Sequence, residues 1–162
     1  MTERFRVVPA SYVFLLRDGT RTGHDEVLLQ LRQNTGFMDG HWAAAAAGHV
    51  EKGETAYAAA HREAAEELGV HGLDLTFVTA LQRTRNDRPI DERIDFFFSA
   101  RTWTGEPTIA EPDKCAALKW VRLDELPEPV VPHERQVLEG LRAGGVAPYT
   151  THGFTNEGAE GS

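Results

Sequence analysis

The sequence predicts a single α/β (α+β) domain, and three observations support this prediction. Apolar segments rich in β-branched and aromatic residues recur between turn-forming stretches, which is typical of strands. Two segments, 56–68 and 133–142, have the composition of helices. The chain has 162 residues, 41% of them hydrophobic, which is enough for one domain with its own core, and no repeat or composition shift marks a second domain.

The first 50 residues are predicted to form a β-hairpin followed by a loop and a short further segment. Residues Arg6–Leu16 and Val27–Leu31 are apolar and β-rich, and the polar stretch between them supplies turn residues. Residues 32–40 form a loop in this interpretation. The alanine run between His41 and Gly48 favours a helix by propensity, but it is short and ends at glycine. Close backbone packing also selects small side chains, so we expect a strand or loop over 41–48.

The segment Ala56–Leu68 is predicted to be a helix, because it contains no glycine, proline or β-branched residue. Thr55 is a good N-cap, and Gly69 is suited to end the helix. Three further strands are predicted over Leu73–Arg83, Arg93–Thr102 and Ala117–Leu123. The run Phe96–Phe98 indicates a strand buried on both faces rather than an aromatic cage around a ligand.

The C-terminal part is predicted to contain one helix and a tail. The helix covers His133–Arg142, and Gly144 and Gly145 end it. Residues 147–162 are polar and glycine-rich, with little to bury. We therefore expect a domain over residues 1–146 and a disordered tail over 147–162.

Composition excludes several classes of protein. The formal net charge of −8 argues against a protein that grips long nucleic acid through a basic surface. The N-terminus lacks the apolar core of a signal peptide and no run of 18 apolar residues occurs, so we expect no membrane partner and a cytoplasmic location. Cys115 is the only cysteine, which rules out an internal disulfide and a cysteine-rich zinc site.

Three glutamates in the first predicted helix form a candidate metal site. Glu63, Glu66 and Glu67 are three or four residues apart, so their side chains project from one face of a helix. Such pairs of like charges each destabilise a helix by a few tenths of a kcal/mol unless a cation lies against them. A hard divalent cation bound by carboxylate oxygens is the natural candidate, and Mg²⁺ usually accompanies a phosphate-bearing substrate.

The surrounding residues resemble the Nudix hydrolase family. Gly48, Glu54 and the run Arg62–Val70 (REAAEELGV) match the Nudix box at every charged and glycine position. Seven fixed residues, each at a usage of about one in fifteen, would match by chance with a probability on the order of 10⁻⁶. Ala64 departs from the larger aliphatic residue that is usual there, which concerns helix packing. The segment Glu111–Pro127 is similar to the second half of MutT-like nucleoside triphosphate diphosphatases.

The resemblance implies a fold and a metal site. The fold is an α/β/α sandwich with a mixed β-sheet between helices. The metal is Mg²⁺, with Mn²⁺ as the alternative, and its ligands are the carboxylates of Glu63, Glu66 and Glu67 and the backbone carbonyl of Ala47. The chain has Ala46-Ala47 where many members have Pro-Gly, but the carbonyl survives this change. The resemblance also implies that Glu54 and Arg62 form a structural salt bridge.

The implied reaction is attack of water on a phosphorus of a nucleoside diphosphate linked to a further group. The metal neutralises phosphate oxygens and lowers the pKa of water, while a carboxylate accepts the proton. Glu66 or Glu63 is the first choice for this base, with Glu111 in reserve. The small nucleotide substrate is expected to contact Arg32, His49 and Glu111.

Each of these substrate-binding assignments has a structural alternative. Arg32 is equally well explained as a solvated residue at a strand end, and His49 is slightly better explained as structural or solvated. Phe37, Met38 and Trp42 are candidates for base contacts, but burial in the core explains them with fewer assumptions. Cys115 is expected to pack as a small apolar group and not to act as a nucleophile.

We expect a hydrolase that cleaves nucleoside triphosphates, modified ones included, to the monophosphate and pyrophosphate. The nearest alternative is a pyrophosphatase acting on ADP-ribose or a nucleotide sugar. An alternative of another class is a domain that senses nucleotides without turnover, although such domains commonly lose box glutamates and this chain keeps them. Many family members are dimers, so we also carry a homodimer as an expectation.

Overall fold

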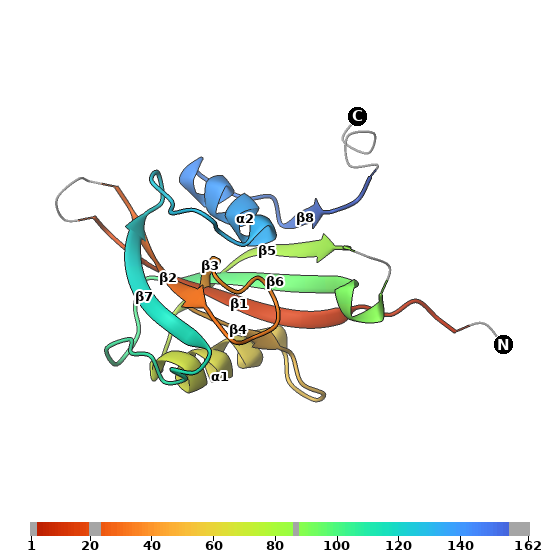
Figure 1. Cartoon of the computed structure of the whole chain (residues 1–162), viewed down its shortest axis with the longest axis horizontal. Helices are drawn as coiled ribbons and strands as arrows, with labels where there is room; N and C mark the ends of the chain where they lie inside the picture. Colours follow the sequence, from red (N-terminus) through yellow and green to blue (C-terminus); the bar gives the residue numbers. More distant parts are fainter. Residues whose placement is uncertain (1–2, 20–23, 86–87, 156–162) are drawn as a thin grey trace.

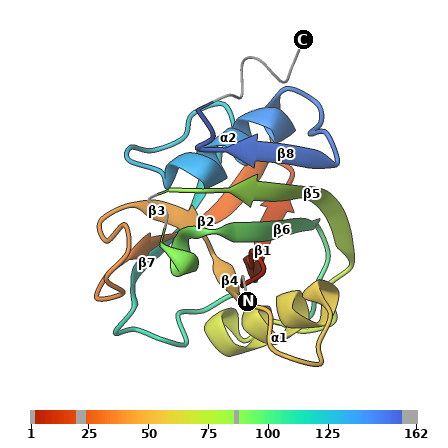
Figure 2. The same cartoon turned by 90° about the vertical axis from the view of Figure 1, so that its right-hand side faces the viewer.

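The structure, a computed structural model, describes residues 3–19, 24–85 and 88–155. An eight-stranded sheet lies between two helices, α1 (Ala56–Leu68) on one face and α2 (Pro132–Arg142) on the other (Figure 1). The turned view separates the same three layers, with β5 and β6 between the helices (Figure 2). The predicted α/β/α sandwich with a mixed sheet is confirmed.

The sheet is mixed because both parallel and antiparallel neighbours occur in it. Its main path runs β3-β2-β1-β6-β5-β8, with β4 paired to β1 and β7 paired to β2. Pairs β1·β6 and β5·β8 are parallel, and the others are antiparallel. The strands are β1 (Val8–Arg17), β2 (Glu26–Arg32), β3 (Trp42–Ala44), β4 (Ala46–His49), β5 (Leu75–Arg83), β6 (Arg93–Ala100), β7 (Cys115–Arg122) and β8 (Tyr149–His152), with a short 3₁₀ helix, η1 (Pro89–Asp91), before β6.

Strand β1 is the centre of the sheet because it changes partner along its length. Its first half pairs with β4 from Ala10 to Val13, and its end pairs with β2 at Leu16 and Arg17. On its other edge it runs parallel to β6 over eight residues. All residues from Ala10 to Leu16 of β1 are buried, as expected for a strand covered on both faces.

A separate hydrophobic core lies on each face of the sheet. On the α2 face, Phe14 and Phe97 pack with Val137 and Leu138 of the helix. On the α1 face, Val13 and Phe98 pack with Ala60 and Ala64. Ala64 is fully buried, so a small residue at this box position lets α1 lie close to the sheet.

Helix α1 has the predicted bounds and the predicted caps. The Thr55 hydroxyl accepts a hydrogen bond from the Ala58 amide at 3.0 Å, and Gly69 ends the helix in the left-handed region at φ 70°. The buried Ser11 hydroxyl of β1 donates to the carbonyl of Ala56 at 2.7 Å. This bond fixes the start of the helix against the central strand.

Most predicted elements are confirmed to within two residues. The segment 41–48 forms β3 and β4, which favours the strand interpretation of the alanine run over the helix. Phe97 and Phe98 are buried in β6, as predicted. Cys115 is also buried, and its thiol donates to the Ala117 carbonyl, which fits the packing role.

The prediction of a disordered tail from residue 147 is wrong for Tyr149–His152, which form β8 beside β5. This strand is held by polar side chains, which a search for apolar segments overlooks. The hydroxyls of Thr79 and Thr150 lie 2.9 Å apart, and Tyr149 donates to Gln82 at 2.8 Å. Residues 156–162 of the predicted tail lie outside the described residues.

No helix among the described residues is both long enough and apolar enough to cross a membrane.

Candidate active site

The strand β4 separates two polar regions because its side chains alternate between the two faces of the sheet. Ala47 packs towards the α2 face, and Ala47 and His49 both line a cleft there. Gly48 faces α1, where a Cβ atom would overlap the carboxylate of Glu63. The carboxylate of Glu63, a glutamate of the same box, therefore occupies the space that a side chain at position 48 would take.

Glu67 is bonded directly to the edge of β4. Its carboxylate accepts a hydrogen bond from the Ala47 amide at 2.8 Å. In an antiparallel ladder, a residue whose N–H points away from its partner strand also points its carbonyl away. The Ala47 carbonyl therefore lies on the edge of β4 that Glu67 and Glu63 cover.

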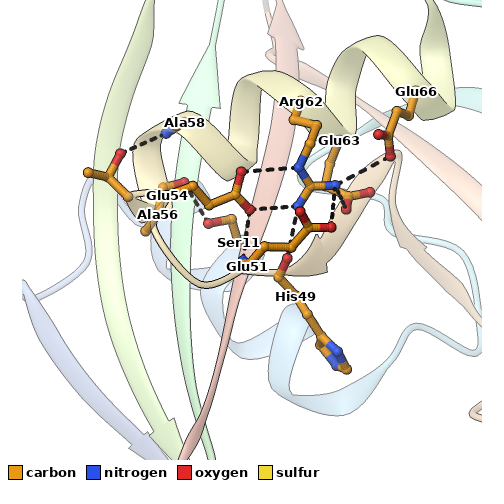
Figure 3. Close-up of polar contacts among 10 residues, drawn as sticks. Ser11, His49, Glu51, Glu54, Ala56, Ala58, Arg62, Glu63 and Glu66 are labelled. Atoms are coloured by element: carbon orange, nitrogen blue, oxygen red, sulfur yellow. Dashed lines mark hydrogen bonds and ion pairs between the residues drawn. The ribbon is translucent and has the colours of Figure 1, made fainter.

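Arg62 is the centre of an ion-pair network on α1, and Figure 3 shows it between the loop and the helix. Its guanidinium donates to Glu54 at 2.7 and 3.1 Å and to the carbonyl of His49 at 3.0 Å. It also contacts Glu63 at 2.8 Å and Glu66 at 3.4 Å. The pair Glu54 and Arg62, expected as a salt bridge, thus ties the loop after β4 to the helix, while the His49 ring points away from Arg62.

The carboxylates around β4 are crowded together and partly buried. The pKa of Glu67 is raised to about 8, mainly by burial and also by the charges of Glu63 and Glu111, while a hydrogen bond from the Ala47 amide and the charge of Arg32 oppose the rise. Burial also raises the pKa of Glu63, opposed by Arg62. Glu66 is exposed, with 53% of its side chain accessible. A cation placed here would favour the ionised form of all three.

The donor set fits a divalent metal ion in its chemistry. Carboxylates and a backbone carbonyl are the hard oxygen ligands that Mg²⁺ and Mn²⁺ prefer. Among the described residues, no three acidic, histidine or cysteine side chains already stand in a metal-binding arrangement. The reason is visible in the bonds: Glu63 is turned to Arg62 and Glu67 to the Ala47 amide. Each of these bonds occupies one oxygen of its carboxylate, Oε1 of Glu63 and Oε2 of Glu67.

We expect Mg²⁺ to stabilise the fold more at pH 8 than at pH 5.5. The pKa of Glu67 is higher in the folded state, so this state keeps a proton that the unfolded state releases, and stability falls as pH rises from about 4.5 to 8. Mg²⁺ reverses this loss because it binds the ionised form. Ligand at 100 times its Kd adds about 2.7 kcal/mol, which corresponds to roughly 5 to 10 °C in Tm. Differential scanning calorimetry with MgCl₂ and with EDTA checks this, and equal shifts at the two pH values would contradict it.

A cleft of about 560 Å³ lies on the α2 side of the box. It brings together Ala47, His49 and Arg32, three of the residues predicted to act in the site. Arg32 donates to the Phe37 carbonyl at 2.9 Å and to Thr35 at 3.0 Å, so it holds the loop after β2. Burial lowers the pKa of His49, with a further contribution from Arg93, which favours the neutral ring at pH 7.

Glu111 does not line this cleft. It lies in a separate small cavity with Glu67 and Cys115, close enough for its charge to raise the pKa of Glu67. The structure thus places Glu111 beside Glu67 and outside the cleft that Arg32 and His49 line. Its roles as reserve base and as substrate contact stay predictions.

Most of the polar residues that line the cleft were not predicted from the sequence. Glu134, at the start of α2, is buried and accepts a hydrogen bond from the Ala44 amide at 2.7 Å, and burial raises its pKa to about 7. Phe37 is part of the lining, in agreement with its candidacy for base contacts. The missed cations are Arg83, Arg85, Arg88 and Arg93. The available signal was the repeated arginine in the stretch 83–93, which covers the ends of two predicted strands and the polar loop between them.

The comparison with known families agrees with this geometry. Residues 7–141 match the model of the NUDIX domain family. The chain therefore belongs to the NUDIX domain family, and it is a Nudix hydrolase. No curated protein sequence matches the chain at a significant level.

Similar solved structures give evidence on the subgroup and on the fold. A MutT NUDIX hydrolase from Burkholderia pseudomallei is 29% identical, with a TM-score of 0.64 over 80% of this chain and 96% of that one. A MutT protein from Bacillus halodurans is 22% identical, with a TM-score of 0.69 over 90% and 88%. A Caenorhabditis elegans Ap4A hydrolase is 21% identical, with a TM-score of 0.62 over 85% and 96%. The last two show the fold alone, and the match to the MutT NUDIX hydrolase supports the MutT-like subgroup.

Proposed function

We propose that this Nudix hydrolase is a metal-dependent pyrophosphohydrolase that cleaves nucleoside triphosphates, modified ones included, to the monophosphate and pyrophosphate. The observation that carries this proposal is the group of carboxylates at the edge of β4, where Glu67 bonds to the Ala47 amide, the Glu63 carboxylate lies against Gly48, and burial raises the pKa of both. Such a site is suited to a divalent cation that accompanies a phosphate chain. The adjacent arginine-lined cleft supports an anionic substrate.

Glu63, Glu66, Glu67 and the Ala47 carbonyl would hold the ion, Mg²⁺ or Mn²⁺. The ion, when bound, neutralises phosphate oxygens and lowers the pKa of water. Arg62 fixes the loop and helix that carry these groups, since it bonds both Glu54 and the His49 carbonyl. Arg32 and the neutral His49 are proposed to orient the phosphate chain.

The proton of the attacking water goes to a carboxylate. Glu66 is exposed and its bond to Arg62 is long at 3.4 Å, so it is free to turn towards water. Glu63 is the other first choice, although it must leave Arg62 at 2.8 Å. Glu111 stays in reserve because it lies near Glu67 and outside the arginine-lined cleft.

A panel of nucleotides and nucleotide sugars tests the proposal. Each compound is incubated with Mg²⁺, with Mn²⁺ or with EDTA, and the products are separated by ion-exchange chromatography. The proposal predicts monophosphate and pyrophosphate from at least one nucleoside triphosphate, with no turnover in EDTA. Release of orthophosphate alone, or equal turnover in EDTA, would refute it. Hydrolysis in ¹⁸O-water shows which phosphorus is attacked.

The same panel separates the alternatives. Faster turnover of ADP-ribose or a nucleotide sugar than of any triphosphate would favour the second enzyme class. Tight binding of one member without any turnover would favour a nucleotide-sensing domain. The predicted cytoplasmic location and homodimeric state stay predictions, which cell fractionation and light scattering can check.

A further inference from the structure

The cleft contains a second cationic region, separate from the carboxylates of the box. Five arginines line the cleft, namely Arg32, Arg83, Arg85, Arg88 and Arg93. This concentration stands against a net charge of −8 for the whole chain. Asp91 and Glu134 also line the cleft, so five arginines face two acidic residues, and the local charge is opposite in sign to the overall charge, which indicates an anion-binding surface.

The inner end of this region is a buried cluster on β5 and β6. Arg83 is only 6% exposed and donates from Nε to Asp95 at 2.5 Å, and Asp95 is fully buried. Arg93 lies on the other side of the same carboxylate, with its Nε 3.9 Å from Oδ1 of Asp95. Among the described residues neither of those two buried atoms has a hydrogen-bond partner. One carboxylate thus holds two guanidinium groups at the wall of the cleft.

Strand register sets the distance between this cluster and the box. His49 of β4 is opposite Ala10 of β1, and Ala10 is opposite Asp95 of β6. Neighbouring strands lie about 4.8 Å apart, so the backbone of β6 lies roughly 10 Å from that of β4. A diphosphate held against Glu67 and the Ala47 carbonyl does not reach the cluster.

The space between the two ends is lined by an aromatic ring. The guanidinium carbons of Arg32, Arg83 and Arg85 lie 5.6, 5.9 and 5.3 Å from the centre of the Phe37 ring. Arg32 is near the box, because its charge lowers the pKa of Glu67. Arg83 belongs to the far cluster. The ring therefore spans the gap between the near and far cations, where a nucleoside would lie.

We propose that Arg83 and Arg93, positioned by Asp95, form a second phosphate subsite that binds a phosphate group on the sugar of the nucleotide. This inference rests on the proposed function, in which a diphosphate lies against the box. Asp95 supplies one negative charge for two guanidinium groups, so a neutral sugar or base would leave one positive charge unbalanced. A phosphate monoester offers two charges and several acceptor oxygens, which match the fork of an arginine. The substrate class is then a nucleotide phosphorylated on its ribose.

Binding of nucleotides without metal tests the subsite directly. Isothermal titration in EDTA compares AMP, ADP, adenosine 2′,5′-bisphosphate and adenosine 3′,5′-bisphosphate. All four share the 5′-phosphate, and ADP places its second phosphate beside the first. We expect at least one bisphosphate to bind about tenfold more tightly than ADP, because the gain of one charge-assisted hydrogen bond is of that size. Equal or weaker binding of both bisphosphates would overturn the proposal.

Substitutions test whether Arg83 and Arg93 form the second phosphate subsite. Arg93→Gln is expected to reduce the advantage of the bisphosphate over ADP to less than about threefold, since one charged contact is lost. Arg83→Lys keeps a charge for Asp95 but loses the fork, and a similar reduction is expected. Arg101→Gln is the control, because Arg101 pairs with Asp18 and Asp25 and does not line the cleft. Folded Arg93→Gln and Arg83→Lys proteins that both keep the full advantage would overturn the assignment.

Turnover separates failure of this inference from failure of the proposed function. Two matched pairs of substrates are compared. The first pair is ADP-ribose and ADP-ribose 2′-phosphate, and the second is GTP and GTP that carries a 3′-phosphate. Preference for the phosphorylated member of either pair supports the subsite. Turnover of the panel without any such preference overturns the subsite alone. Absence of all turnover refutes the hydrolase proposal, and the binding experiment then still decides the subsite.

Discussion

Replacing Glu67 with glutamine is expected to lower kcat/KM by about 10²- to 10⁴-fold, the range for loss of a group that binds the metal or moves a proton. Glutamine keeps an oxygen to accept the hydrogen bond from the Ala47 amide, so the edge of β4 stays in place. It removes a charge whose pKa is raised to about 8 by burial and by Glu63 and Glu111. Without metal, the variant should therefore be at least as stable as the parent at pH 8.

Steady-state kinetics on the best substrate and calorimetry at pH 8 measure both effects. Glu139→Gln is the matched control, since Glu139 is an exposed helical glutamate on α2 whose contact is with Arg135. It should leave kcat/KM within a factor of two. Activity of the Glu67→Gln variant near that of the parent would show that the carboxylate cluster is not the metal site.

The box could be predicted from the sequence because its chemistry depends on local spacing. Glu63, Glu66 and Glu67 fall on one helical face whatever surrounds them, and Thr55 and Gly69 set the ends of that helix. The bond between Glu67 and Ala47 also joins residues that are only 20 positions apart. Local periodicity and family resemblance are sufficient for such a site.

The arginine-lined end of the cleft depends on contacts that periodicity does not encode. Asp95 directly precedes the aromatic run Phe96–Phe98, and only the pairing of β5 with β6 places it beside Arg83. Glu134 reaches the cleft because α2 packs on the sheet, 90 positions from its partner Ala44. β8 was missed for a similar reason, because its bonds to β5 and to Gln136 involve polar side chains that also suit a tail.

Replacing Gly48 with alanine is expected to displace the Glu63 carboxylate and reduce kcat/KM at least tenfold, and to destabilise the fold by about 1 kcal/mol, the low end of the cost of overpacking, because the colliding atoms end a flexible side chain. The new Cβ would lie 2.7 Å from Oε2 of Glu63 and still closer to the rest of its carboxylate. A glycine-to-alanine change at an unstrained, open position normally stabilises by about 0.4 to 1 kcal/mol. A loss of stability therefore reports the collision with Glu63.

Gly145→Ala provides the reference for that change, because a Cβ at Gly145 meets no atom within 4 Å. Urea denaturation of Gly48→Ala, Glu63→Ala and the double variant then isolates the contact. If the collision is the cause, the double variant regains stability relative to the sum of the single changes, with a coupling of about 0.5 to 3 kcal/mol. Its activity stays low, because the Glu63 carboxylate is gone. Additive stability changes would mean that Gly48 is required for some other reason, whereas recovered activity would remove Glu63 from the metal site.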